Sequence, residues 1–220
     1  MRNSYICNHN IIINIYGGWI MKGNYLNLLE KRRSCYELSN EIPLSDDELL
    51  EMTRRVVLNT PSAFNSQSTR ILLLVGERHA QFWNIVKIVL SRLVPADAFH
   101  ATEKKIDVSF ASGYGTFLFY EDMSIIEELC REHKIYSGQF PTWAEHTNAM
   151  HQFAIWTALT EYGLGASLQH YNPIIDDAVR EVFEVKESWK LIAQMPFGKC
   201  EGSAGDKTFL SVDERMLMLG

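Results

Sequence analysis

Apolar residues recur every three or four positions along much of the chain, and short continuous apolar runs lie between these periodic segments. Spacing of three and four residues places apolar side chains on one helix face, whereas a short unbroken apolar run is typical of a buried strand. The pattern predicts helices from residue 22 to the Arg32-Arg33-Ser34 cluster and over 46–59, 79–94, 122–132, 143–162 and 173–183. It predicts strands over 71–75, 116–120 and 190–195, the first fully buried and the last ended by Pro196.

Two of the predicted helices carry local signals at their ends. Ser45 and Glu48 form a capping-box pattern at the start of the second predicted helix, and Pro61 disfavours helical geometry just beyond its end. At the start of the last predicted helix, we expect Asn172 to be the cap and Pro173 to occupy the first turn.

Helices outnumber strands and separate them along the chain, which favours an α+β or α/β layered domain with a mixed sheet. With 220 residues, of which 46% are hydrophobic, the chain is long enough to bury a core and is expected to form a single domain. The longest predicted helix, 143–162, is followed directly by Gly163, which is typical of the residue just past a helix end. The stripe that we expect it to bury consists of Met150, Phe153, Ala154, Thr157 and Ala158.

Charge and cysteine content exclude several classes of protein. Lysine plus arginine is 21 and aspartate plus glutamate is 27, and the net charge of −6 opposes binding to nucleic acid or to an anionic membrane surface. No apolar stretch approaches the roughly 20 residues that span a bilayer. The four cysteines are widely spaced, so we expect neither a zinc site nor a dense disulfide framework, and a reduced, cytoplasmic chain.

The N-terminal segment differs from the rest of the chain. No acidic residue occurs from Met1 to Leu29, and the isoleucine run at 11–15 is too short and too interrupted by asparagine for a signal-peptide core. We therefore predict that residues 1–20 are an N-terminal extension, either disordered or an artefact of the start site, and that the folded domain covers 21–220. The alternative is a targeting segment or a tail that packs on the domain.

The familiar signatures of catalysis are missing. The sequence has no G-x-S-x-G elbow, Walker loop or H-E-x-x-H motif, and the 163–168 segment departs from a dinucleotide fingerprint at Leu168. Three polar clusters remain as candidates for holding a phosphorylated cofactor: Arg32-Arg33-Ser34, the 61–67 loop and the 168–172 connection. The first offers two guanidinium groups and a hydroxyl, which suit phosphate oxygens. Taken alone, the three clusters also fit a solvated helix end, a capped turn and an ordinary connection between helices.

Taken together and in this order, these segments resemble the FMN-dependent nitroreductase family. The matching set is Arg32-Arg33-Ser34, 61–67, 163–173, Pro196-Phe197-Gly198 and Lys207, and it spans about residues 22–219. Tyr36 and the segments 113–116 and 169–173 make the chain most similar to the compact branch of that family, the fatty-acid-repression nitroreductase-like proteins. The resemblance implies an α+β fold, with a mixed central sheet flanked by helices, in an intertwined homodimer with FMN in clefts at its interface.

The resemblance also implies which residues contact FMN. The group expected at the phosphate and the pyrimidine edge is Arg32, Arg33, Ser34 and Lys207. The group expected to come from the partner subunit is Ser62, Ala63, Asn65 and Gln67. The group expected along the connection that approaches the reactive ring is Gly165, Ala166, Gln169 and His170.

The activity implied by the resemblance is the reduction of nitroaromatic or quinone-type acceptors with NAD(P)H, by a ping-pong mechanism. FMN would carry the chemistry, so no catalytic side chain and no metal are expected, and the missing signatures fit this reading. The alternatives are a flavin-binding regulatory or sensor protein with little turnover and a binding protein without flavin.

The chain departs from the family at two points. Tyr36 stands where many members have Arg or Lys, so one flavin contact is lost or replaced. A helical insertion that lines the substrate channel of longer relatives is lacking, which leaves the substrate preference open. Phe117, Phe140 and Trp143 are candidate walls for a flat aromatic acceptor, although aromatic residues at such spacing also belong to cores.

Overall fold

The computed structural model describes residues 11–14, 18–21 and 24–220. Helices make up most of the regular structure in this part of the chain. They are α1 (Asn24–Lys31), α2 (Asp46–Asn59), α3 (Gly76–Ser91), α4 (Ala96–Ile106), α5 (Met123–Glu132), α6 (Phe140–Glu161) and α7 (Asp176–Phe183). The strands are β1 (Ile11–Asn14), β2 (Gly18–Met21), β3 (Leu38–Ser39), β4 (Thr69–Val75), β5 (Gly115–Asp122), β6 (Leu164–Ala166) and β7 (Trp189–Cys200).

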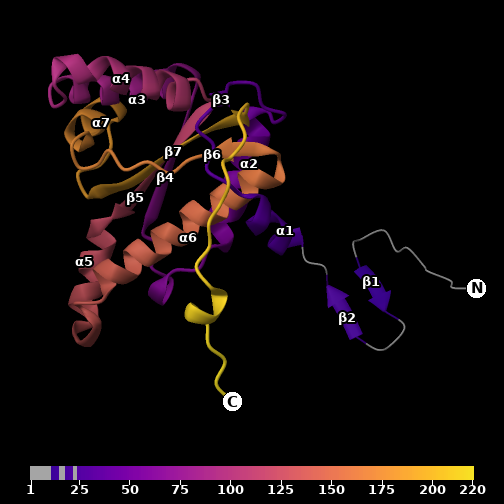
Figure 1. Cartoon of the computed structure of the whole chain (residues 1–220). Coiled ribbons are helices and arrows are strands. Elements are labelled where there is room, and N and C mark those ends of the chain that lie inside the picture. Colours follow the sequence, from indigo (N-terminus) through magenta and orange to yellow (C-terminus); the bar gives the residue numbers. More distant parts are fainter. Residues whose placement is uncertain (1–10, 15–17, 22–23) are drawn as a thin grey trace, which may run out of the picture.

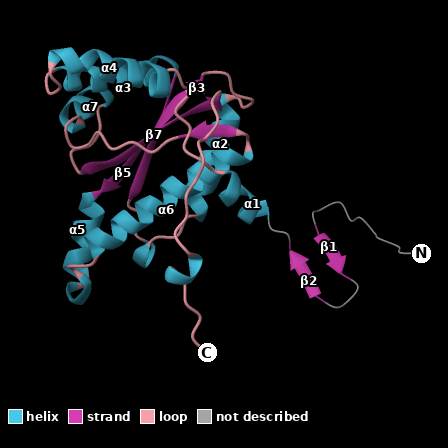
Figure 2. Ribbon diagram, viewed as in Figure 1, coloured by secondary structure: helices cyan, strands magenta, loops and turns pink. Residues whose placement is uncertain are grey.

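The main sheet has five strands in the order β3-β7-β5-β4, with β6 also paired to β7. Each of these pairings is antiparallel, and the parallel contact in the described residues is the isolated bridge between Ser34 and Ala166. Helices cover both faces of the sheet, with α3, α4 and α7 on one side and α2 and α6 on the other (Figures 1 and 2). This is the α+β class that the sequence predicts, although the strand pairings are antiparallel rather than mixed.

The central strand β5 explains why there are two helical layers. Successive side chains of a strand point to opposite faces, and all eight residues of β5 are buried. Leu118 and Tyr120 pack into the core under α3, α4 and α7, whereas Phe117 and Phe119 pack into the core under α2 and α6. A strand that is apolar on both faces therefore requires a helical layer on each side.

The capping box predicted at the start of α2 is confirmed. Glu48 N–H donates to Ser45 Oγ, and Ser45 N–H donates to a Glu48 carboxylate oxygen at 2.9 Å. The helix ends at Asn59, as expected from Pro61. Two local signals thus fix both ends of this element.

The prediction of a fully buried strand at 71–75 is wrong. Only Leu74 of that run is buried, because β4 lies at the edge of the sheet and pairs with β5 alone. A continuous apolar run shows that both faces of a strand are covered, but it does not show on which side a neighbouring strand is missing.

The buried stripe predicted for the longest helix is also wrong in large part. Met150 and Phe153 are 42% and 41% exposed, although Thr157 is buried. The face of α6 that meets the core carries Asn148, Gln152, Ile155 and Leu159 among its residues. Because α6 has apolar residues on more than one face, periodicity alone does not decide which face meets the sheet.

Two boundaries near prolines differ from the prediction. Strand β7 continues through Pro196, which pairs with Thr116 of β5, and ends at Cys200. Helix α7 begins at Asp176 rather than at Pro173, because residues 172–175 form a turn. The Asn172 side chain accepts a hydrogen bond from Gln194 Nε2 at 3.0 Å instead of capping the helix.

Helix α4, and the π-helical segment Asp107–Ala111 that follows it, are not predicted by the apolar pattern. The reason is that α4 buries only Ile106, so its sequence lacks the repeated apolar positions of a helix that packs along its length.

The prediction that residues 1–20 form an extension falls in part on residues 1–10 and 15–17, which lie outside the described residues. Strands β1 and β2 pair with each other in a two-stranded antiparallel sheet. In the part of the chain that the structure describes, no helix is both long and apolar enough to cross a membrane.

The expectation of a fully reduced chain is corrected by a disulfide between Cys35 and Cys200. Their Cα atoms are 6.0 Å apart although 165 positions separate them in sequence. Cys35 N–H donates to the carbonyl oxygen of Ala166 on β6, and both β6 and β3 pair with the end of β7, so the sheet brings the two cysteines together. Wide spacing along the chain therefore says nothing about pairing across the sheet.

Candidate functional site

A cleft of about 510 Å³ opens where the segment after α1 meets the segment after β7. It is lined by Arg32, Arg33, Ser34, Cys35, Tyr36, Glu37, Cys200 and the residues from Gly202 to Lys207. The structure thus brings the Arg32-Arg33-Ser34 cluster together with Lys207, which the sequence holds far apart. Its volume lies within the range of roughly 300–1,000 Å³ that is usual for small-molecule sites.

Among the described residues, the two arginines are held by a cation–π contact and a backbone hydrogen bond rather than by ion pairs with carboxylates. The Arg32 guanidinium carbon lies 4.4 Å from the centroid of the Trp156 ring, a cation–π contact. Burial, with a smaller contribution from neighbouring Arg33, lowers the pKa of Arg32. Arg33 Nη2 donates to the carbonyl oxygen of Gly205. Among the described residues, no ion pair joins a carboxylate to Arg32, Arg33 or Lys207.

Three cationic side chains therefore share one cleft, together with the hydroxyl of Ser34 and the acidic residues Glu37 and Asp206. Fork-shaped guanidinium groups bind phosphate oxygens through paired hydrogen bonds, and a lysine adds a point charge. The residues present consequently fit a phosphate monoester better than an uncharged ligand.

Strand β6 packs beneath the Cys35 and Cys200 wall of this cleft. Ala166 is buried, and its carbonyl oxygen accepts a hydrogen bond from Cys35 N–H at 3.0 Å. A Cβ atom on Gly165 would lie 2.8 Å from the Cβ atoms of both Cys35 and Cys200. Gly165 and Ala166 thus shape the backbone beneath the disulfide, and any side chain larger than hydrogen at 165 would collide with it.

The predicted 61–67 loop lies elsewhere in the same chain. None of Ser62, Ala63, Asn65 and Gln67 lines the cleft that holds Arg32. The loop contains a single 3₁₀ turn, Ala63–Asn65, and three residues with positive φ, namely Phe64, Asn65 and Gln67. Such conformations persist in non-glycine residues when surrounding contacts hold them.

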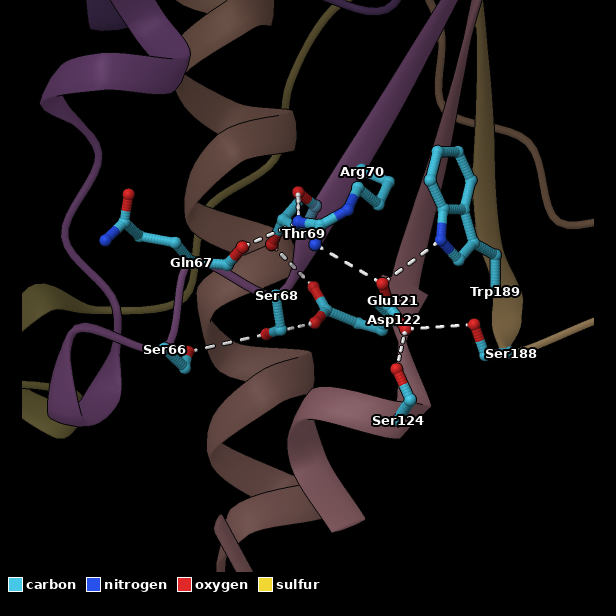
Figure 3. A network of polar contacts seen from close by, with 10 residues as sticks. All are labelled: Ser66, Gln67, Ser68, Thr69, Arg70, Glu121, Asp122, Ser124, Ser188 and Trp189. Carbon is cyan, nitrogen blue, oxygen red and sulfur yellow. Dashed lines mark hydrogen bonds and ion pairs between the residues drawn. The ribbon is translucent and has the colours of Figure 1, made fainter. Parts of the chain in front are cut away.

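A polar network at the start of β4 supplies those contacts (Figure 3). Arg70 Nη1 donates to the carbonyl oxygen of Gln67 at 2.6 Å, and Ser62 Oγ accepts from Gln67 N–H at 3.0 Å. Ser68 Oγ donates to the buried carboxylate of Glu121 at 2.6 Å, so the end of the loop is tied to the centre of the sheet.

Asp122 completes the network next to Glu121. It accepts hydrogen bonds from Ser124, Ser188 and Trp189, and its carboxylate lies 3.3 Å from Arg70 Nη2. Burial by itself would raise the pKa of Asp122, but the hydrogen bonds from the two serines and the charge of Arg70 together lower it. Arg70 therefore faces an ionised carboxylate while it holds Gln67.

The connection from Ser167 to Asn172 is fixed by Gln194, which is fully buried on β7. The backbones of Gln169 and Gln194 exchange hydrogen bonds of 2.7 and 2.9 Å, and Tyr171 N–H donates to Gln194 Oε1 at 2.7 Å. His170 is exposed. Sequence reasoning missed Gln194, although a buried amide in an apolar strand is a signal for such an anchoring role.

Comparisons with known proteins bear on this arrangement. Residues 29–199 match the nitroreductase family. The chain is 35% identical over 191 residues to nitroreductase FRM2 of Saccharomyces cerevisiae, an alignment that covers 86% of this chain and 94% of that protein. The chain belongs to the nitroreductase family.

Two further relatives agree. The putative nitroreductase HBN1 of Saccharomyces cerevisiae is 32% identical over 192 residues, covering 86% of this chain and 94% of that protein. The structure of nitroreductase CinD from Lactococcus lactis with nicotinic acid is 38% identical, has a TM-score of 0.81, and is matched over 89% of this chain and 100% of CinD. These relatives make the chain an oxidoreductase of the nitroreductase type.

Within this nitroreductase-family fold, two of the three candidate aromatic walls belong to the core. Phe117 and Phe140 are 0% and 1% exposed. Trp143 is partly exposed and stacks on Phe64 with ring centroids 6.1 Å apart, and Tyr136 joins the same cluster. Phe64, an exposed aromatic residue within the polar 61–67 loop, is not among the aromatic walls that the sequence predicts.

Proposed function

We propose that the protein is an FMN-dependent oxidoreductase that uses NAD(P)H to reduce nitroaromatic or quinone-type acceptors in a ping-pong cycle. The observation that carries this proposal is the cleft in which Arg32, Arg33 and Lys207 gather without carboxylate partners among the described residues. When bound, FMN would supply the transfer of two electrons from the nucleotide to the acceptor. The protein's own residues then have to bind FMN, orient it toward the nucleotide and the acceptor, and shield it from water.

The phosphate end of FMN is assigned to the cleft. Arg32 is held against Trp156 and Arg33 is fixed by Gly205, so both guanidinium groups are pre-positioned before a ligand arrives. Pre-positioning lowers the conformational entropy that binding would otherwise cost. Ser34 adds a hydroxyl donor to the same wall of the cleft.

A homodimer accounts for the separation between the cleft and the 61–67 loop. We propose that Ser62, Ala63, Asn65 and Gln67 act on the FMN held by the other copy, because they do not line the cleft of their own chain. The structure also leaves an apolar groove between α1 and α6, with Tyr25, Met150 and Phe153 among its lining residues. Exposed apolar surface of this kind is typical of protein–protein interfaces.

The C-terminal arm supports the same homodimer. From Ser203 to Gly220 every residue is exposed, including Phe209, Leu217 and Leu219, and the arm leaves the body of the molecule (Figure 1). A segment with this many exposed apolar side chains gains stability when a second copy covers it.

We assign the acceptor side to the surface formed by Phe64, Tyr136 and Trp143. These aromatic rings are next to the Ser62–Gln67 loop and present a partly exposed face on which a flat aromatic compound can stack. The related nitroreductase CinD has been solved with 4-nitrophenol and with chloramphenicol. A small aromatic acceptor fits both observations.

Anaerobic absorption spectroscopy tests the proposal. The full chain loaded with FMN should lose its flavin absorbance when NADH or NADPH is added and regain it when a nitroaromatic or a quinone follows. If neither nucleotide bleaches the bound flavin, the proposed enzymatic activity is contradicted and a flavin-binding regulatory protein is favoured. If the chain takes up no FMN, the proposed cofactor is contradicted as well.

A further inference from the structure

The Cys35–Cys200 disulfide lies in the wall of the cleft that gathers the cationic side chains. Cys35 directly follows Arg32-Arg33-Ser34, and Cys200 directly precedes the segment that carries Lys207. The disulfide is therefore a covalent link between the two segments that supply positive charge to the cleft.

The other contacts that hold the second segment lie between Glu201 and Gly205. Glu201 N–H donates to the carbonyl oxygen of Glu37 at 2.9 Å, Ser39 Oγ donates to the Glu201 carboxylate at 2.6 Å, and Arg33 donates to the carbonyl oxygen of Gly205. Beyond Gly202 every residue is exposed, and β3, which pairs with the end of β7, has only two residues. The position of Lys207 relative to Arg32 thus depends on a short, weakly anchored stretch of chain.

The cleft gives a reagent in solution a route to the disulfide. Cys200 is partly exposed, whereas Cys35 is buried with 5% exposure, and both residues line the cleft. On the opposite side, Gly165 packs against the Cβ atoms of both residues, so access is from the cleft. A ligand that fills the cleft would cover the disulfide.

We propose that Cys35 and Cys200 are a reversible redox modification site that sets the affinity of the cleft for the phosphate of FMN, an inference that rests on the proposed function. In the oxidised form the disulfide holds the Lys207 segment beside the two arginines. In the reduced form the two thiols release that segment, and the phosphate loses part of its positive surroundings. The oxidised chain consequently binds FMN more tightly than the reduced chain.

Common reagents can form and break this disulfide, and the atoms and electrons balance in both directions. A peroxide takes two electrons from the two thiols, so that the S–S bond forms, the O–O bond breaks and two water molecules leave when the oxidant is hydrogen peroxide. A dithiol such as dithiothreitol reverses the step by thiol–disulfide exchange, becomes oxidised itself and returns one proton to each cysteine sulfur. Because binding and reduction are linked, FMN must protect the disulfide from reduction by the same factor by which oxidation strengthens FMN binding.

Titration of FMN into the oxidised and the dithiothreitol-reduced full chain tests this inference. We expect reduction to raise the Kd for FMN at least about fivefold, the lower end of common coupling between sites. Riboflavin, which lacks the phosphate, should bind both forms with the same Kd. Mass spectrometry of the peptide pair that contains Cys35 and Cys200 verifies the redox state, and circular dichroism verifies that both forms are folded.

Two variants provide controls. The Cys35→Ser/Cys200→Ser double variant should bind FMN with the weaker affinity of the reduced chain and show no response to dithiothreitol. Cys130→Ser, which changes the free cysteine of the described residues, should keep the full response. An equal Kd for FMN in both redox forms would overturn the inference while the proposed function stands. Parallel weakening of riboflavin would overturn it too, and no FMN binding in either form would overturn both proposals.

Discussion

At the scale of single residues, the buried side chain of His79 has a hydrogen-bond partner at each of its two ring nitrogens. His79 is 4% exposed; its Nδ1 lies 2.9 Å from Thr116 Oγ1 and its Nε2 lies 3.1 Å from the carbonyl oxygen of Ala111. Trp83 Nε1 also donates to Thr116 Oγ1 at 2.9 Å. A neutral His79 that donates from Nε2 and accepts at Nδ1 satisfies every group in this set, because the Thr116 hydroxyl then donates to His79.

This geometry predicts that His79 contributes to stability only while it is neutral. Burial lowers the pKa of His79 below its ordinary value of 6.5, and the hydrogen bond to Ala111 offsets only part of that effect. The unfolded chain binds the proton on His79 more readily than the folded chain does. The contribution of His79 to stability is therefore fully present at a pH above its ordinary pKa and is lost as the pH falls below that pKa. Urea unfolding of His79→Gln should show about 1–3 kcal/mol less stability at pH 7 and a shallower loss between pH 7 and 5.

His100→Gln is the matched control, because His100 is exposed. It should leave both the stability and its pH dependence unchanged. Identical pH profiles for the wild type and His79→Gln would contradict the role given to His79. Burial also lowers the pKa of His151, so we expect the variant to keep part of its acid sensitivity.

At the scale of elements, the sequence predicts what local chemistry decides. The ends of α2 follow from Ser45, Glu48 and Pro61, which act within a few residues of themselves. The exposed position of Phe153 and the edge position of β4 could not be predicted, because they depend on which surfaces meet after folding.

In the candidate site, too, local features could be predicted from the sequence and long-range contacts could not. Arg32-Arg33-Ser34 is visible as a charged cluster, but only the resemblance to a family links it to Lys207 across the chain. The disulfide was not predicted, because it depends on how β3 and β6 pair with the end of β7. Long-range pairing of this kind leaves no local signal in the sequence.

The exposed face of α6 gives a prediction about assembly. Phe153→Glu places a charge in the apolar groove between α1 and α6, and we expect it to shift the protein from dimer to monomer in sedimentation velocity experiments. Ile135→Glu is the control, because Ile135 is 91% exposed and lies outside this groove. A wild-type chain that sediments as a monomer with FMN bound, or equal dissociation of both variants, would contradict the proposed interface.

At the scale of the whole molecule, one chain holds the parts of the proposed site in two places. The cleft with Arg32 and the loop with Asn65 share no lining residue, so a single copy does not assemble them. In a two-fold symmetric dimer each site would combine the cleft of one copy with the loop of the other. The disulfide at the cleft and the polar network behind the loop would then support opposite sides of the same ligand.

The most direct test of the shared site is the FMN content of a mixed dimer. Arg32→Ala damages the cleft, and Asn65→Gly removes the loop side chain while permitting the positive φ at that position. Each variant alone should retain little FMN, whereas the surface control Arg131→Ala should retain it fully. A purified dimer of one Arg32→Ala chain and one Asn65→Gly chain carries both defects in one site and none in the other. It should therefore regain about half of the wild-type FMN content. A mixed dimer that binds no more FMN than its parent variants would contradict the shared site.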